Sequence, residues 1–189
     1  MGSHVALLRA VNVGGCNRVA MADLRELFAH LGLEPVQTFL QSGNVVFAGL
    51  SRAGKTLERS LAAQCAARLG VETEFFVRSA RQWSDVVERN PFSEEARETP
   101  GKLVVVFLKK PVSGSVMRSL EGAIKGKEYV SAARSHLYVV YPDGIGRSRL
   151  SASVIERALG CPGTARNWNT VLKLQAAVSQ ASNARDHRR

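Results

Sequence analysis

The chain has 189 residues, of which 45% are hydrophobic, and its 26 Lys and Arg residues against 16 Asp and Glu give a formal net charge of +10. This length fits one large or two small domains, and the hydrophobic content is sufficient for a sizeable core. No apolar run approaches the roughly 20 residues that span a bilayer, and the N-terminus shows no secretory signal pattern. We therefore expect a cytoplasmic, soluble protein with no membrane partner.

The cysteines and the charge distribution further narrow the classes of protein to which the chain can belong. Cys16, Cys65 and Cys161 are scattered, so they predict no disulfide framework and no C-x-x-C metal site. Residues 1–90 hold ten basic and eight acidic side chains, whereas residues 91–189 hold sixteen and eight. The excess of positive charge thus belongs to the second half, where it favours anionic partners such as nucleic acid or phosphorylated metabolites. A general compositional bias toward arginine explains the same excess equally well.

Apolar periodicity predicts a first set of elements ending near residue 90. Both faces of the first strand are apolar, with Val5 and Leu7 on one and Ala6 and Leu8 on the other, so we expect both faces to be covered. In chain order the prediction is a strand over 4–12, a helix over 21–31, strands over 36–41 and 45–48, a helix over 57–69, a strand over 74–77 and a helix over 79–88.

The second half repeats this order after a polar, charged stretch. The predicted elements are a strand over 102–108, a helix over 115–124, strands over 129–133 and 137–141, a helix over 151–159, a short strand over 164–166 and a helix over 168–180. The order βαββαβ is typical of ferredoxin-like units. We therefore predict an α+β protein of two tandem ferredoxin-like units (residues 1–90 and 102–182), each followed by an extra helix, with a linker over 91–101 and a flexible basic tail over 183–189.

Two further patterns bear on this duplication and on ligand binding. Arg81-Gln82-Trp83-Ser84 in the helix after the first unit is similar to Arg166-Asn167-Trp168-Asn169 in the second, which suggests two units derived from one ancestor. The segment 11–18, Val-Asn-Val-Gly-Gly-Cys-Asn-Arg, joins a strand to a helix, and such a glycine-rich loop can present backbone N–H groups to an anion. It matches neither of the usual nucleotide-binding glycine motifs.

Four segments together resemble one known family. Residues 6–15, 21–24, 41–47 and 166–170 resemble, in the same order along nearly the whole chain, the bacterial family called domain of unknown function 1697. The resemblance implies two tandem ferredoxin-like units and no established biochemical role. One departure is Cys16, where the family commonly has lysine, so that Arg18 is the basic residue of this loop.

The leading hypothesis is a binding protein that holds a small anionic or phosphate-bearing ligand at the seam between its two units. The residues expected to line this site are Arg9, Asn12, Gly14, Gly15, Asn17, Arg18, Ser42, Asn44, Arg166, Asn167 and Trp168. Each also has a structural interpretation: the glycines and asparagines suit tight turns, a buried arginine can pair with a carboxylate, and an asparagine can cap a helix.

Two alternatives remain open. The first is a nucleic-acid-binding protein that uses the basic residues of the second half: Lys109, Lys110, Lys125, Lys127, Arg134, Arg147 and Arg149. The second is a small enzyme of unknown reaction, although no catalytic motif is found. The chain offers no Cys–His arrangement, no clustered metal ligands and no cofactor motif, so we predict no catalytic residue, metal or cofactor. The sequence does not specify an oligomeric state.

Overall fold

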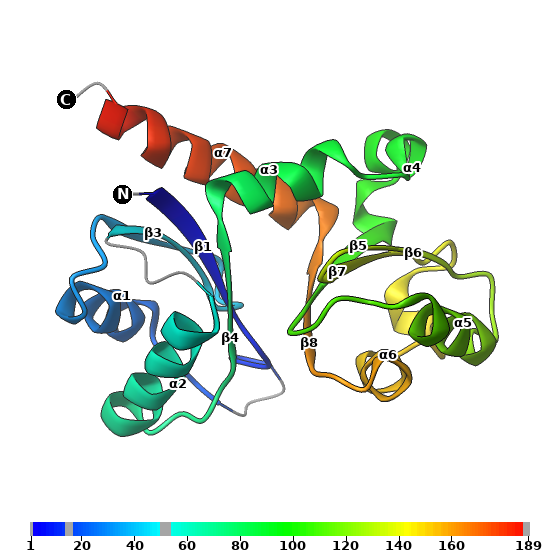
Figure 1. Ribbon diagram of the computed structural model, residues 1–189, viewed down its shortest axis with the longest axis horizontal. Helices are drawn as coiled ribbons and strands as arrows, with labels where there is room; N and C mark the ends of the chain where they lie inside the picture. The colour runs from blue at the N-terminus through cyan, green and yellow to red at the C-terminus, as the bar shows by residue number, and fades with distance from the viewer. Residues whose placement is uncertain (1, 14–16, 50–53, 187–189) are drawn as a thin grey trace. The chain divides into compact units, whose positions relative to one another are not determined.

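The protein is a mixed α+β molecule with two four-stranded antiparallel sheets and, among the residues described, seven α-helices (Figure 1). The computed structural model describes residues 2–13, 17–49 and 54–186. The chain divides into two compact units, one formed by residues 1–85 and 173–189 and the other by residues 86–172. The C-terminal residues from 173 onward thus belong with the first unit, whereas the sequence interpretation assigns residues 102–182 to the second.

The first unit contains a sheet with the strand order β2-β3-β1-β4. Its register pairs Val5 of β1 with Val46 of β3 and with Arg78 of β4. The elements up to residue 88 are β1 (Gly2–Leu8), α1 (Met21–His30), β2 (Val36–Phe39), β3 (Asn44–Gly49), α2 (Lys55–Leu69), β4 (Phe75–Ser79) and α3 (Ala80–Glu88).

The second unit repeats this arrangement with the strand order β6-β7-β5-β8. Val105 of β5 pairs with Tyr138 of β7 and with Arg166 of β8. The remaining elements are α4 (Ser93–Glu98), the 3-10 turn η1 (Pro100–Lys102), β5 (Leu103–Leu108), α5 (Gly114–Ala123), β6 (Tyr129–Ala133), β7 (His136–Val140), the 3-10 turn η2 (Ile145–Arg147), α6 (Ala152–Leu159), β8 (Gly163–Asn167) and α7 (Trp168–Asp186).

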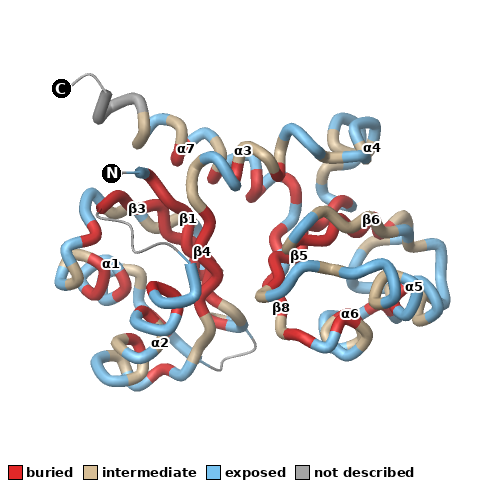
Figure 2. Tube along the Cα trace, viewed as in Figure 1, coloured by how far each residue is buried: buried red, intermediate tan, exposed pale blue. Residues whose placement is uncertain are grey.

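One face of each sheet packs against two helices to form a hydrophobic core. In the first unit, Leu24 and Phe28 of α1 and Leu61 of α2 join strand residues such as Phe47 and Phe75. The second core combines residues of β5 and β7 with Leu120 of α5 and Ile155 and Leu159 of α6. Buried residues follow the central strands β1, β3, β5 and β7, whereas β2 and β6 contain none (Figure 2). Consecutive residues of β1 and of β5 are buried, which confirms the expectation that both faces of the first strand are covered.

Several boundaries differ from the predicted ones for local reasons. The first strand ends at Leu8 rather than residue 12, because Ala10 and Asn12 adopt positive φ angles of 53° and 55°, which interrupt extended backbone. The strand also starts earlier, at Gly2. Residues 91–101, expected as a linker, contain α4 and the first two residues of η1. Ser79 ends β4 and begins α3 with a reciprocal cap, since its hydroxyl accepts from the Gln82 N–H and its N–H donates to Gln82 Oε1.

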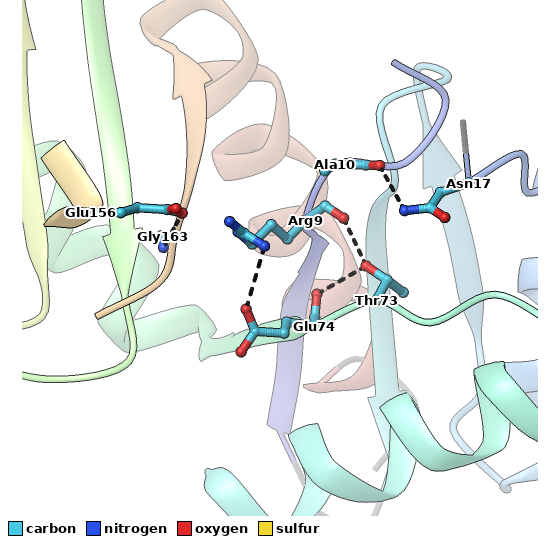
Figure 3. Close-up of polar contacts among 7 residues, drawn as sticks. All are labelled: Arg9, Ala10, Asn17, Thr73, Glu74, Glu156 and Gly163. Carbon is cyan, nitrogen blue, oxygen red and sulfur yellow. Dashed lines mark hydrogen bonds and ion pairs between the residues drawn. The ribbon is translucent and has the colours of Figure 1, made fainter. Parts of the chain in front are cut away.

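A glutamate on the preceding helix satisfies a backbone N–H of the strand at one edge of each sheet. Glu58 of α2 accepts from the Val77 N–H of β4 at 2.7 Å. Glu156 of α6 accepts from the Gly163 N–H at the start of β8 at 2.9 Å (Figure 3). Because unpaired N–H groups on an edge strand invite pairing with another chain, these carboxylates help to protect the two edges.

Candidate functional site

Several turns of the first unit meet at one end of its sheet. The Leu8 N–H, at the end of β1, donates to the Gly43 carbonyl at 2.9 Å, and the Arg9 N–H donates to the Glu74 carbonyl at 3.0 Å. These two bonds join the segment after β1 to the turn between β2 and β3 and to the start of β4. The structure therefore brings together four of the residues expected at the ligand site, Arg9, Asn12, Ser42 and Asn44, and we call residues 9–12, 41–44 and 73–74 the turn cluster.

The Asn12 side chain makes three hydrogen bonds around the turn cluster. Its side-chain amide donates to the carbonyl oxygens of Val19 at 3.0 Å and Gln41 at 2.7 Å, and its Oδ1 accepts from the Val19 N–H at 2.9 Å. With a positive φ angle of 55°, it occupies a backbone conformation that asparagine tolerates better than most residues. Asn12 thus ties two separate turns to the start of the following segment, and both of its amide hydrogens are used within the protein.

The Ser42-Gly43-Asn44 turn is likewise held by hydrogen bonds within the protein. The Asn44 amide donates to the Phe39 carbonyl at 2.8 Å and to the Ser42 hydroxyl at 2.9 Å, and Asn44 is completely buried. At Gly43 a Cβ atom would lie 2.5 Å from Val11 Cγ2 and 2.8 Å from Leu8 Cβ. The glycine is required because the turn approaches the end of β1 too closely for any side chain.

Arg9 keeps some exposure within the turn cluster. One guanidinium nitrogen lies 3.9 Å from a Glu74 carboxylate oxygen, and both side chains are about two-fifths exposed, at 39% and 42% (Figure 3). The Thr73 hydroxyl donates to the Arg9 carbonyl at 2.8 Å, and the Asn17 amide donates to the Ala10 carbonyl at 3.4 Å. Arg18 is exposed. Gly14 and Gly15, the proposed anion cradle, lie outside the described residues.

Arg166, Asn167 and Trp168 belong to the second unit. The Arg166 guanidinium donates to the Thr164 hydroxyl at 2.9 Å and to the Ala165 carbonyl at 2.7 Å, and its burial lowers the pKa to about 10. Asn167 caps α7, since its Oδ1 accepts from the Thr170 N–H at 2.9 Å. Trp168 is buried. Asn167 therefore acts as a helix cap and Trp168 as a buried packing residue, as the structural interpretation of the sequence expects.

The register corrects the internal repeat read from the sequence. Arg166 on β8 faces Val105 of β5, and the residue in the equivalent place of the first sheet is Arg78 on β4, which faces Val5 of β1. Arg78 is also buried, and burial lowers its pKa although the Glu58 carboxylate 3.8 Å away opposes this shift. Arg81, matched to Arg166 by its neighbouring tryptophan, lies instead in the exposed first turn of α3. An alignment of the two units on their shared Arg-x-Trp pattern therefore differs by three residues from the alignment that the sheet register gives.

A pocket of 260 Å³ lies wholly within the second unit, between the segment that precedes β6 and the loop that follows β7. We call it the basic pocket. It includes four of the seven basic residues predicted to bind nucleic acid: Lys125, Lys127, Arg147 and Arg149. Its remaining lining residues are Gly126, Glu128, Tyr141, Pro142, Asp143, Gly144 and Ser148. The four basic residues come from the segment before β6 and the loop after β7. These two segments lie side by side because Tyr129 at the start of β6 pairs with Val140 at the end of β7.

The two arginines of the basic pocket have no side-chain partner among the residues that the structure describes. Lys127 lies 3.6 Å from an Asp143 carboxylate oxygen, with both side chains mostly exposed, and Lys125 Nζ donates to the Gly122 carbonyl at 3.2 Å. Arg147 and Arg149 are exposed residues of the β7–α6 loop. The pocket thus presents a surplus of positive charge that the protein itself does not neutralise.

Glu128 adds a half-buried carboxylate to this basic surface. Its Oε1 accepts a short hydrogen bond from the Ser148 hydroxyl, and that hydroxyl in turn accepts from the Leu150 N–H at 2.9 Å. Burial raises the pKa of the Tyr141 phenol to about 12, and the Glu128 charge contributes to this shift. Tyr141 therefore stays neutral at physiological pH, and its hydroxyl donates to the Leu150 carbonyl at 3.1 Å.

The other three basic residues predicted to bind nucleic acid lie at the opposite end of the second sheet. Lys109 and Lys110 follow the last residue of β5, and Arg134 is in the β6–β7 turn, where its carbonyl accepts from the Val112 N–H. The pocket loop instead begins at Tyr141, whose N–H donates to the Lys102 carbonyl before β5 starts. Because a six-residue strand spans roughly 20 Å, the seven basic residues form two separate groups rather than one patch.

Sequence reasoning missed Gly126, Glu128, Tyr141 and Ser148 as neighbours of the predicted basic residues. The signal was present in the predicted hairpin over 129–133 and 137–141. Its outer ends necessarily bring the residues before 129 beside those after 140. Within the described ranges, the structure holds no group of three or more His, Cys, Asp or Glu side chains arranged for a metal ion. No helix in the described part of the chain is both long and apolar enough to cross a membrane.

Comparison with known proteins agrees with the fold and supplies no activity. The chain is similar in structure to a conserved bacterial protein, SP0830, from Streptococcus pneumoniae, with a TM-score of 0.69 and 19% sequence identity, over 94% of this chain and 98% of that one. None of the curated proteins matches it. The model of a protein family of unknown function, DUF1697, matches residues 1–138. The chain therefore belongs to the DUF1697 family.

Proposed function

We propose that this protein binds a small anionic ligand that carries a phosphate group, and that the basic pocket of the second unit is the binding site. The observation that carries the proposal is the convergence of four basic side chains on a 260 Å³ pocket, two of them arginines without a side-chain partner among the described residues. This volume is just below the roughly 300 Å³ at which small-molecule sites usually begin, so it suits a compact ligand.

The charge balance of the lining supports an anion. Four cations face two carboxylates, and one of those carboxylates, Asp143, already lies beside Lys127. Arg147 and Arg149 bring planar guanidinium groups, whose parallel N–H donors match the oxygen atoms of phosphate. An isolated ion pair at this exposure contributes little to stability, which makes a binding role a better explanation for the cluster than a folding role.

We also infer that each unit has the ferredoxin-like βαββαβ arrangement. The strand orders β2-β3-β1-β4 and β6-β7-β5-β8, with two helices on one face of each sheet, support this inference. In such a unit the basic pocket lies beyond one end of the sheet, among connecting segments. Loops on a rigid sheet are common positions for binding residues, because they can vary without disturbing the core.

The proposal is tested by thermal shift at two salt concentrations with sugar phosphates, nucleotides, dicarboxylates, and short RNA and DNA. A phosphate-bearing small molecule at one hundred times its Kd is expected to raise the Tm by about 5 °C or more, since ligand binding stabilises the native state. The Arg147→Ala/Arg149→Ala double variant should lose this shift. The matched control, Lys109→Ala/Lys110→Ala, removes two basic residues from the other end of the sheet and should keep it.

Two outcomes would contradict the proposal. If only oligonucleotides raise the Tm, and the effect disappears steeply as salt increases, the protein binds nucleic acid through a wider surface. In that case both double variants should weaken binding. If a small anion binds but the Arg147→Ala/Arg149→Ala variant binds it as well as the unmodified protein does, the ligand occupies another site.

A further inference from the structure

The basic pocket contains a feature that an anion site does not need. Glu128 lines it together with the four cations, and a carboxylate there weakens the attraction for any negatively charged ligand. We therefore ask what a carboxylate contributes in such a place. Two functions are available: it can position the loop that carries Arg147 and Arg149 through Ser148, or it can accept a hydrogen bond from the ligand.

The two oxygens of Glu128 differ in their surroundings. Oε1 accepts from the Ser148 hydroxyl, which fulfils the positioning function. Oε2 is buried and receives no hydrogen bond from the described residues. A desolvated carboxylate oxygen without a donor is unfavourable, so the second oxygen is the part of this side chain that the fold itself leaves unused.

The neighbouring donors are directed elsewhere. The Tyr141 hydroxyl donates to the Leu150 carbonyl, Lys125 Nζ to the Gly122 carbonyl, and Lys127 lies beside Asp143. None of these three donors reaches Glu128 Oε2. A ligand in the pocket is therefore the natural source of the missing donor.

Gly126 lies against this oxygen and, because it has no side chain, leaves room for the carboxylate. A Cβ atom at residue 126 would lie 2.5 Å from Glu128 Oε2 and 2.9 Å from Oε1, which is closer than side chains approach. The φ angle of Gly126 is outside the left-handed region, so this glycine is not required by backbone conformation. Because Oε2 is enclosed in this arrangement, a ligand reaches it only when the carboxylate turns about its terminal torsion, which is broad in glutamate; the same turn moves Oε1 relative to the Ser148 hydroxyl.

We propose that the basic pocket selects hydroxylated phosphate esters, the class of sugar and polyol phosphates, with Glu128 accepting a hydrogen bond from a ligand hydroxyl while the cations hold the phosphate. This selectivity rests on the proposed function. A hydroxyl suits the site better than an ammonium group, because the four cations that line the pocket repel a further positive charge. A phosphate without a hydroxyl leaves Oε2 without its donor.

Calorimetric titration with two matched probes tests the selectivity. Glycerol 3-phosphate and methyl phosphate are both phosphate monoesters, and only the first carries hydroxyl groups. We expect the unmodified protein to bind glycerol 3-phosphate about tenfold more tightly, the value of one charge-assisted hydrogen bond. In Glu128→Gln this ratio should fall to about twofold, while methyl phosphate binds as tightly as before or more tightly. Gly126→Ala should lower the ratio as well, whereas the control Gly146→Ala, where a Cβ meets nothing within 4 Å, should keep it.

Each of the other outcomes contradicts either the hydroxyl selectivity or the proposed function. If Glu128→Gln weakens both probes equally, Glu128 only positions the arginine loop and the selectivity is wrong. If the unmodified protein binds both probes with the same Kd, the pocket holds phosphate without reading hydroxyl groups. If neither probe binds, the proposed function fails and the selectivity fails with it.

Discussion

The turn cluster of the first unit and the basic pocket of the second use similar residue types in opposite ways. In the turn cluster, Asn12 and Asn44 use their amide groups on backbone carbonyls, and Arg9 lies beside Glu74. In the basic pocket, Arg147 and Arg149 have no such partner among the described residues, and one oxygen of Glu128 lacks a donor. The distinctive motif of the first unit thus marks a turn with strict backbone requirements, whereas the proposed binding site of the second unit rests on charge that the described residues do not pair.

The largest effect on stability is expected at Gly43. In Gly43→Ala the new Cβ would meet Val11 and Leu8 at 2.5 and 2.8 Å, at a φ angle of +68°. Overpacking and left-handed strain together should lower the free energy of unfolding by about 3 kcal/mol or more. Urea denaturation followed by circular dichroism measures this loss.

Gly32→Ala is the matched control for Gly43→Ala. Gly32 has nearly the same φ angle, +69°, and a Cβ there meets nothing within 4 Å. It should therefore show the backbone strain alone, about 1 kcal/mol. Equal losses in the two variants would mean that the close approach of the turn to β1 contributes nothing.

The next effect is expected at Asn12. Asn12→Ala removes three hydrogen bonds and places alanine at a positive φ angle of 55°. We expect the free energy of unfolding to fall by about 2 kcal/mol, because the Val19 N–H and two carbonyls lose partners in a partly buried place. Asn17→Ala, at a φ angle of 50° and with one exposed bond of 3.4 Å, should cost less than about 1 kcal/mol.

Asn12→Ala also sharpens the comparison between the two regions when ligand binding is measured. If the turn cluster is structural, Asn12→Ala should leave the affinity of the basic pocket for a phosphate ester unchanged at temperatures where the variant is folded. A loss of affinity in Asn12→Ala, with the basic pocket intact, would assign the ligand to the turn cluster instead.

Much of the fold could be predicted from the sequence, since both repeats of βαββαβ follow from apolar periodicity. The second hairpin was placed almost to the residue, because β-branched and aromatic residues flank a short polar turn there. The helix α4 was missed because its six residues, SEEARE, bury no side chain and carry no periodic signal. The end of β1 was missed because positive φ angles at Ala10 and Asn12 are tertiary in origin.

The candidate site was harder to predict than the fold. Four of its basic residues could be named from charge alone, but their separation from Lys109, Lys110 and Arg134 depends on which end of the sheet each loop occupies. Glu128 carried no signal as a single acidic residue in a basic region. Its importance emerges only from its contact with Ser148 and from the missing side chain of Gly126, and both depend on three-dimensional proximity.

A smaller effect on stability is expected when the pH is lowered, through His4 of the first unit. His4 is buried in β1 against Phe47, and this burial lowers the pKa of its imidazole below 6.5. The unfolded chain therefore binds a proton at a higher pH than the folded chain, so the stability contributed by neutral His4 is complete above pH 6.5 and declines as the pH falls below it. His4→Phe, which preserves the ring stacking, should give a shallower fall in Tm between pH 7 and pH 5. An unchanged slope would show that other groups cause the acid sensitivity.

The smallest effect on stability is expected in the basic pocket, where binding should change instead. Lys127 and Asp143 form a pair 3.6 Å apart whose side chains are 77% and 62% exposed. Lys127→Ala and Asp143→Asn should each alter the free energy of unfolding by less than about 0.5 kcal/mol. Their effects on phosphate-ester affinity should have opposite signs at low salt: removing the cation weakens binding a few-fold, and removing the carboxylate strengthens it by a similar factor, both reduced at high salt. Because the two variants break the same ion pair, a merely structural role for that pair predicts equal changes of the same sign, and calorimetric titration separates the two cases.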